Sequence, residues 1–413
     1  MAVAGATRGS YCALVQVPTY PWLVSAVLLS RMSNAMSQIT VVIYLLERTG
    51  SPALAGAGAA AQLLPAVATG PLAGAWLDRV ASRTRLVVTT QAIRGSLLVA
   101  LVLAGEMANP PAVVYLLILA GLGLTFPLPN PGFRSLVPLI VPRPLWTAAN
   151  AVDSVSFDVS FVIGPALAAV MTTAVGAPLA IVAQAAVTFG SALAASQVRE
   201  PTGRPLSEER TVAAAMTGLR AVWSHAELRA TMALMFVSGV GYGAFLVGLP
   251  LWARDHLGHS AGASGWMWVA FSAGSIIGGL AYGARRPRGS DAGHVILFVA
   301  LTGLPLLLVP FVPTLSAGMV CMAAAGLLSA PAVIAMFAIR QDAVPPELHG
   351  RTFAITVSVN VAGSPVGAML AGLLIVPLGI HTLLFAAGAA QLAAAAVASG
   401  MLAGEPRPAA CET

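Results

Sequence analysis

The sequence predicts an all-α integral membrane protein, with twelve transmembrane helices in two pseudo-symmetric six-helix bundles. Of the 413 residues, 58% are hydrophobic and 9% are charged, whereas soluble globular proteins are about 45–50% apolar and about 25% charged. The mean hydropathy is +0.86. The apolar runs are long and apolar on all sides. This pattern fits spanning helices and excludes the short alternating strands of a membrane barrel.

Cutting the chain at its charged or Pro/Gly-rich breaks gives twelve segments near the length of about 20 residues that a bilayer requires. The first six are Trp22–Leu46, Pro52–Leu77, Leu86–Gly105, Ala112–Asn130, Ala149–Val175 and Ala177–Val198. The first is too long for the core of a signal peptide, so we expect it in the mature protein. The fourth ends with Pro127, Pro129 and Pro131, which lack backbone donors. We expect this segment to be a rigid exit from the span at the cytoplasmic mouth.

The other six segments are Ala230–Trp252, Gly262–Tyr282, Gly293–Val312, Thr314–Ile339, Phe353–Val376 and Gly379–Leu402. Residues 199–229 separate the two sets and form the longest polar stretch, with Ser207 as the candidate cap of a surface helix. We therefore expect an N-terminal six-helix bundle (1–198), a cytoplasmic linker with an amphipathic helix (199–229) and a C-terminal six-helix bundle (230–413). Matched motifs lie about 200 to 208 positions apart, as in transporters with parallel repeats that hold substrate between them.

The basic residues indicate the orientation, because all 21 of them are arginine. With a cytoplasmic N-terminus, Arg48 and Arg254 lie outside, Arg31 and Arg94 lie within spans, and the other arginines face the cytoplasm, as the positive-inside rule requires. Both termini are then cytoplasmic. We expect the protein to span the inner (plasma) membrane several times. The net charge of +6 therefore reflects topology, with contact to anionic membrane lipid secondary. An RNA-binding aromatic pattern is absent, so we expect no nucleic acid partner.

The composition also argues against metals and cofactors. Three scattered cysteines offer no disulfide framework or zinc spacing, and His256 and His259 form a pair without a third ligand. A chain without lysine has no G-x-x-x-x-G-K nucleotide loop. We expect no metal and no cofactor.

The stretch from Gly70 to Val87 reads GPLAGAWLDRVASRTRLV. It resembles the loop between spans two and three of the major facilitator superfamily, most closely in its bacterial drug and metabolite exporters. The matching residues are Gly74, Asp78, Arg79 and Arg83. Ala81 replaces a glycine of the family pattern, and Thr84 replaces its second basic residue.

This resemblance implies a transporter that works as a monomer and has an inner gate in this loop. Asp78 would face the N-terminal end of span eleven near Arg351, while Arg79 and Arg83 pair with acids on neighbouring helices. A carboxylate at a helix N-terminus gains about 0.3–1 kcal/mol. Positive-inside charge alone is the simpler explanation of the arginines, but it does not account for Asp78.

Span five contains FVIGPALAAVM. Many exporters of the superfamily carry Gly-Pro followed by paired glycines here, a motif associated with proton-antiport export. Gly164 and Pro165 match as the helix kink, and Ala168 and Ala169 stand in for the glycines. A kinked packing helix, common to any transporter, is the alternative.

Polar residues within the spans are candidates for the substrate cavity. They lie on spans that line the central pathway in the family that this chain resembles: Asn34, Gln38, Gln62, Tyr242, Ser272 and Asn360. Each alternatively makes a structural hydrogen bond between helices, worth about 0.6 kcal/mol.

Arg31 and Asp158 are candidates for proton coupling. Charges in the bilayer centre are costly and are usually paired. Counted from the cytoplasmic end at about 1.5 Å per residue, both lie roughly 14–15 Å deep. We expect an ion pair that holds Asp158 ionised until the pair separates. Asp153 is the rival site, with Arg94 or Arg134 holding it structurally. Mutual neutralisation without a further role is the alternative for the pair.

Two classes of function remain. The first is secondary active efflux of a small hydrophobic or amphipathic molecule, driven by protons, with proton-coupled uptake as the alternative. The second is a membrane enzyme or a non-transporting sensor. The sequence lacks an H-E-x-x-H motif and a nucleophile elbow, and it lacks a soluble output domain. We therefore expect a transporter that is not an enzyme, with a small molecule and protons as its partners.

Overall fold

The computed structural model describes residues 12–80, 82–107, 110–200, 223, 225–284, 287, 289–342 and 349–403. In these ranges the chain is helical, without a β-strand. The helices of the first half are α2 (Tyr20–Thr49), α3 (Pro52–Arg79), α4 (Arg83–Gly105), α5 (Ala112–Thr125), α6 (Pro129–Ile140), the short η1 (Arg143–Leu145), α7 (Trp146–Val175) and α8 (Ala177–Ser196). Those of the second half are α10 (Ala226–Asp255), η2 (Ala261–Ala263), α11 (Ser264–Ala284), α12 (Asp291–Leu308), η3 (Val309–Phe311), α13 (Leu315–Asp342), α14 (His349–Leu378) and α15 (Ile380–Ala403).

All twelve predicted spans coincide with these helices, with α5 and α6 together forming the fourth. Among the described residues, eleven segments are long and apolar enough to cross a membrane, and α7 adds the shorter apolar stretch Ile163–Val175. The protein is therefore a multi-pass membrane protein. Its outer faces carry exposed apolar side chains such as Leu117, Leu280 and Val320, as expected of a surface that meets lipid.

Span four differs from the prediction. The prolines do not end it at the membrane surface, because α6 resumes one turn after α5 and the whole span runs over Ala112–Ile140. Pro129 is the first residue of α6, a position where a missing N–H costs nothing since the first amides of a helix have no intrahelical partner. The break at Phe126–Leu128 therefore lies inside the span.

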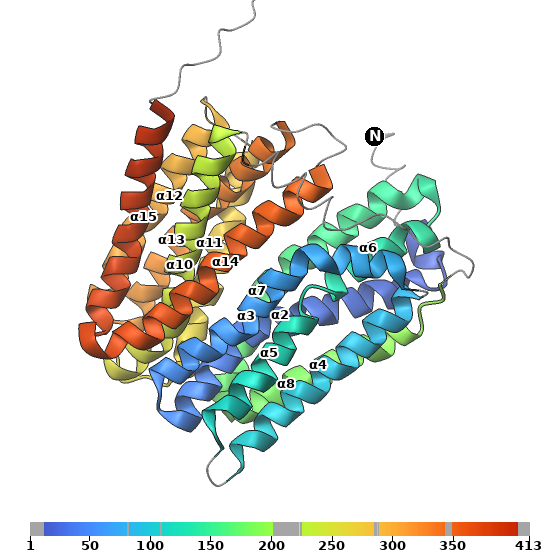
Figure 1. The fold of residues 1–413 in the computed structure, drawn as a ribbon, viewed down its shortest axis with the longest axis horizontal. Coiled ribbons are helices and arrows are strands. Elements are labelled where there is room, and N and C mark those ends of the chain that lie inside the picture. The colour runs from blue at the N-terminus through green and yellow to red at the C-terminus, as the bar shows by residue number, and fades with distance from the viewer. Residues whose placement is uncertain are drawn as a thin grey trace, which may run out of the picture.

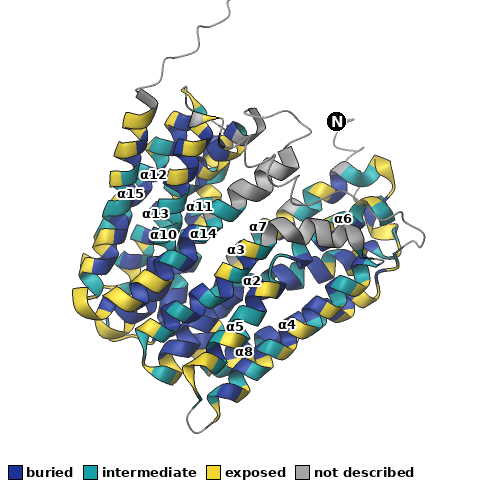
Figure 2. Ribbon diagram, in the orientation of Figure 1, coloured by how far each residue is buried: buried dark blue, intermediate teal, exposed yellow. Residues whose placement is uncertain are grey.

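The helices form two six-helix bundles that pack in the same way (Figure 1). In the first, α2 packs on α7 and α8, α4 on α5 and α8, and α3 on α5. The second repeats this pattern with α10 on α14 and α15, α12 on α13 and α15, and α11 on α13. Buried residues line the faces between helices, and exposed residues lie mostly on the outer faces (Figure 2).

Two helix pairs related by the same pseudo-symmetry join the bundles. These are α3 with α14 and α7 with α11. A Cβ added to Gly56 would lie 2.3 Å from the carbonyl oxygen of Ala368, and one added to Gly265 would lie 2.5 Å from the Cβ of Ala169. These contacts lie where α3 and α11 begin and where α7 and α14 approach their ends, so they share one end of the molecule. We call it the packed end.

The predicted linker helix around Ser207 lies outside the described residues. The boundaries at 199 and 229 therefore remain predictions.

Candidate functional site

A buried ionic network ties α2 to α7 in the N-terminal bundle. Arg31 Nη2 donates to Asp153 Oδ1 at 2.7 Å, and Nη1 donates to the Asp153 carbonyl oxygen at 2.7 Å. The same Nη1 also donates to Ser156 Oγ. Asp153 and Ser156 are three residues apart on α7, so they lie on one face of this helix. Arg31 Nε donates to Asn130 Oδ1 at 3.1 Å, which adds the first turn of α6.

Asp153 accepts from a second arginine. Arg134 Nε donates to Asp153 Oδ2 at 3.0 Å. The side chain of Arg31 is 4% exposed, that of Asp153 16% and that of Arg134 58%. One carboxylate thus balances two guanidinium groups, and the three side chains together carry one positive charge. Removing the carboxylate would leave Arg31 buried and uncompensated, a costly state in a membrane.

The partner of Arg31 differs from the prediction. We expected Asp158, and the structure instead pairs Arg31 with Asp153, the rival site. The prediction compared the depths of Cα atoms only. Helical side chains point back toward the N-terminus of their helix, so the long Arg31 side chain reaches toward the first turns of α2, where Asp153 of α7 lies. The side chain of Asp158 lies outside the described residues.

Two of the predicted cavity residues meet between the bundles. Tyr242 on α10 donates from its hydroxyl to Gln38 Oε1 on α2 at 2.9 Å. The Tyr242 ring packs against Trp268 of α11 with ring centroids 4.8 Å apart, and Phe271 lies 5.8 Å from Trp268. This aromatic group belongs to the C-terminal bundle, and Gln38 belongs to the N-terminal bundle.

The other predicted cavity residues do not meet at one place between the bundles. Gln62 donates to Ser37 Oγ at 2.7 Å, which joins α3 to α2, and Ser272 donates to the carbonyl of Trp268 one turn earlier in α11. Asn34 is buried, and its Oδ1 has no hydrogen-bond partner among the residues that the structure describes. The side chain of Asn360 lies outside the described residues.

The prediction missed a polar contact between α2 and α8. Thr40 donates to Gln184 Oε1 at 2.9 Å, and Gln184 Nε2 donates to the Ser33 carbonyl at 3.0 Å. Gln184 is fully buried. A lone glutamine in an otherwise apolar span was the available signal, because such a side chain needs a partner in the bilayer.

Gly164 has a packing role next to Pro165 in α7. A Cβ at Gly164 would lie 2.4 Å from the Cβ of Ala35 on α2. Glycine is therefore required for the close approach of α7 to α2. This approach brings Asp153, about three turns earlier in α7, within reach of Arg31.

The predicted inner-gate residues lie at helix ends. Gly74, Asp78 and Arg79 are in the last turns of α3, and Arg351 is in the first turn of α14; their side chains lie outside the described residues. Arg83, the first residue of α4, is described. Its Nη1 donates to the carbonyl oxygen of Ser135 on α6 at 2.9 Å.

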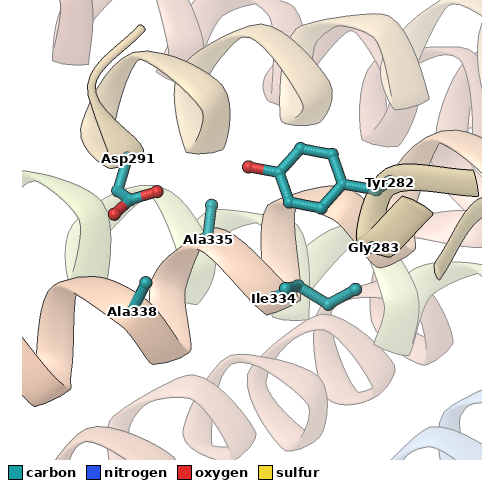
Figure 3. Close-up of a pocket in the computed structure, with 6 residues that line it drawn as sticks. All are labelled: Tyr282, Gly283, Asp291, Ile334, Ala335 and Ala338. Atoms are coloured by element: carbon teal, nitrogen blue, oxygen red, sulfur yellow. The ribbon is translucent and has the colours of Figure 1, made fainter. Parts of the chain in front are cut away.

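The C-terminal bundle carries a pocket at the matching place. Ser290 caps α12 as Ser82 caps α4, each through its Oγ and the amide three residues on. Asp291 then takes the position of Arg83. A cavity of about 100 Å³ lies here, lined by Tyr282, Gly283, Asp291, Ile334, Ala335 and Ala338 (Figure 3). In the N-terminal bundle, Arg83 bridges α4 to α6 at this position.

The sequence comparisons agree with the fold. The profile of the Major Facilitator Superfamily matches residues 23–299. The chain belongs to the major facilitator superfamily. An uncharacterized MFS-type transporter, y4rN of Sinorhizobium fredii, is 30% identical over 377 residues, which cover 89% of this chain and 91% of the relative.

Two further relatives of this superfamily member have named activities. The multidrug efflux pump Tap of Mycolicibacterium fortuitum is 27% identical, over 84% of this chain and 88% of that protein. Macrolide efflux protein A of Streptococcus pyogenes is 24% identical, over 85% of this chain and 88% of that protein.

Solved structures share the superfamily fold. The nucleoside transporter NupG has a TM-score of 0.75 at 13% identity and covers 93% of this chain and 99% of its own. A bacterial homolog of the human lysosomal transporter Spinster, in an inward-facing and unoccupied conformation, has a TM-score of 0.73 at 15% identity, with coverages of 95% and 98%. Together with the family profile and the y4rN relative, this fold makes the protein a membrane transporter of the superfamily.

Proposed function

We propose that this transporter exports small hydrophobic or amphipathic molecules across the inner membrane by alternating access. One observation carries the proposal: among the described glycines, those in tight contact with the opposite bundle lie at the packed end, with Gly56 against Ala368 and Gly265 against Ala169. Two bundles that meet through small residues can close tightly and separate again at such contacts. The efflux activities named for two relatives support the outward direction.

The predicted orientation indicates on which side of the membrane the packed end lies. With both termini in the cytoplasm, α3 and α11 begin at the outer surface, so the packed end closes the outer side. Substrate then enters from the cytoplasm or from the inner part of the bilayer, between the bundles. The transporter works as a monomer, with the two bundles of one chain moving relative to each other.

The substrate site lies around Gln38, Tyr242 and Trp268. These side chains come from both bundles, and they are neutral, with one amide, one hydroxyl and two aromatic rings. A site of this composition favours a planar or apolar body with few hydrogen-bonding groups. Asn34 and Gln62 extend its polar surface along α2 and α3.

Protons drive this transport through the carboxylate on α7. Asp153 binds Arg31 and Arg134, and protonation would remove the charge that holds both. The contact between α2 and α7 would then loosen when the proton binds. Asp158 is the second candidate, one and a half turns further along α7.

Everted membrane vesicles test the direction and the driving force. On energisation, vesicles that contain the transporter should accumulate ethidium, and a protonophore should collapse the gradient. Asp153→Asn should lose this proton-dependent accumulation while reaching the membrane. Asp255→Asn is the matched control, because Asp255 pairs with its exposed neighbour Arg254. Loss of dye from energised vesicles would indicate uptake into the cell, and accumulation that ignores the protonophore would contradict proton coupling.

A further inference from the structure

Arg94 on α4 is a buried cation without a polar partner. Its side chain is 1% exposed, and Nε, Nη1 and Nη2 each lack a hydrogen-bond partner in the described part of the chain. A guanidinium group carries five N–H donors. Leaving them unpaired inside a membrane protein is costly, so such residues are rare and usually mark a function.

The neighbour of Arg94 is the break in span four. The guanidinium carbon of Arg94 lies 5.7 Å from the centroid of the Phe126 ring, in a cation–π contact. Phe126 is the first residue after α5, and α6 begins three residues later. The charge therefore lies against the segment at which this span loses its helical hydrogen bonds.

That segment carries acceptors without helical donors. A carbonyl in a helix accepts from the amide four residues on, but Pro129 and Pro131 have no N–H. The carbonyls of Thr125 and Pro127 are therefore left without helical partners. The unpaired donors of Arg94 thus contact the ring of Phe126, whose chain neighbours Thr125 and Pro127 carry these carbonyls, and no hydrogen bond from Arg94 is formed within the described residues.

The arrangement is specific to the N-terminal bundle. Thr302 occupies the matching position on α12, and it donates to the Phe298 carbonyl of its own helix. The matching span, α13, stays helical through Pro331. The buried cation and the broken span therefore occur together in one bundle and are both absent from the described part of the other.

We propose that Arg94 is a positioning residue of the transport cycle, which hydrogen-bonds the carbonyls of the span-four break when the packed end opens. In the conformation described here, the Arg94 guanidinium group makes a cation–π contact with Phe126 and donates no hydrogen bond within the described residues. Bending at the break in the other state would bring Thr125 and Pro127 into hydrogen-bond range. The unmade bonds destabilise this conformation, and the made bonds stabilise the other one. The inference rests on the alternating access proposed above.

The test measures how often the packed end opens. Thr172 is 5% exposed and contacts η2 at this end, and cysteine is nearly isosteric with threonine. In a background without the native cysteines, Thr172→Cys should react with a membrane-impermeant maleimide only when the packed end opens. If it never reacts in otherwise wild-type transporter, alternating access at this end is wrong, and the role of Arg94 is wrong with it.

Arg94→Met should lower the labelling rate at residue 172 by at least about fivefold, because it removes stabilisation of the open state. Dye efflux should fall with it, while thermal stability stays the same or rises, since a buried unpaired charge is gone. Arg85→Met, at an exposed arginine on the same helix, should change neither. Wild-type labelling and efflux in Arg94→Met would overturn the proposal while leaving alternating access intact.

Arg94→Lys keeps the charge but lacks the planar fork that can bond two carbonyls. In this variant, Thr172→Cys should be labelled at a rate between those of the wild type and Arg94→Met. The lysine variant replaces the methionine variant in the test if the latter does not fold. Normal labelling in a folded lysine variant would also contradict the proposal. A third outcome would also contradict the proposal. If the protein with Arg94 intact is labelled at different rates in chloride and in gluconate media, Arg94 holds an anion.

Discussion

Tyr242 donates a hydrogen bond to Gln38 across the two bundles, with 2.9 Å between the two oxygens. The donor lies near the middle of α10, and the acceptor lies beyond the middle of α2. In the proposed cycle, rocking of one bundle against the other would change this distance directly. The pair would therefore couple the proposed substrate site to the access state.

Tyr242→Phe should weaken the present conformation. Loss of one hydrogen bond between neutral groups costs roughly 0.5–1.5 kcal/mol, so labelling of Thr172→Cys should rise severalfold. Tyr44→Phe is a matched control, because the Tyr44 hydroxyl donates to Leu101 within one bundle. It should lower thermal stability without changing the labelling rate. Equal labelling in the two variants would mean that the Tyr242 bond does not hold the bundles together.

Gly56→Ala should disturb the packed end. The new Cβ would lie 2.3 Å from the Ala368 carbonyl oxygen, a backbone atom that cannot turn aside. We expect faster labelling of Thr172→Cys and weaker efflux. At Gly283 of α11 an added Cβ would meet nothing within 4 Å, so Gly283→Ala should behave as wild type. A silent Gly56→Ala would show that α3 and α14 separate from one another at little cost.

Variants of Arg31 and Asp153 distinguish a structural role of this ion pair from a role in proton coupling. Asp153→Asn leaves Arg31 buried without its charge partner, which typically costs 3–5 kcal/mol, and we expect a lower melting temperature. The double variant Arg31→Met with Asp153→Asn should recover much of that stability. It should still exchange dye down a gradient but should not concentrate it. If the stable double variant still accumulates dye in a proton-driven way, Asp153 has a packing role only. Asp158 would then be the candidate for proton coupling.

Asp78→Asn tests the proposed inner gate. The residue lies in the last turn of α3, and we expect normal insertion with impaired efflux, because the carboxylate would no longer stabilise the N-terminus of span eleven. Surface levels and dye efflux are measured together. Normal efflux at normal surface levels would contradict the gate. The charges of this loop would then serve only to orient the chain in the membrane.

The sequence was sufficient to predict the twelve spans, because bilayer thickness fixes their length and charged or Pro/Gly breaks fix their ends. It was less informative about contacts between helices. Depth alone suggested Asp158 as the partner of Arg31, whereas the direction of the Arg31 side chain selects Asp153. The site residues whose side chains are not described, such as Asp78 and Asn360, remain predictions.

Other features depend on geometry that no local pattern contains. Pro127, Pro129 and Pro131 were recognised as helix breakers, but the resumption of the helix at α6 follows from its packing against α4 and α2. The pairing of Tyr242 with Gln38 depends on how two bundles are placed, and residues 204 positions apart give no periodic signal. Arg94 was recognised as intramembrane, but its isolation became visible only in three dimensions.

The packed end has a consequence for the response of the transporter to temperature. Glycine and alanine have no side-chain rotamers to freeze, so closing the contacts between Gly56 and Ala368 and between Gly265 and Ala169 costs almost no side-chain entropy. An interface of long side chains would lose such entropy at each closure, and heating would then favour its opening. A junction of small residues lacks this term. In the proposed transport cycle, the ratio of the two access states should therefore change little between a cold and a warm cell.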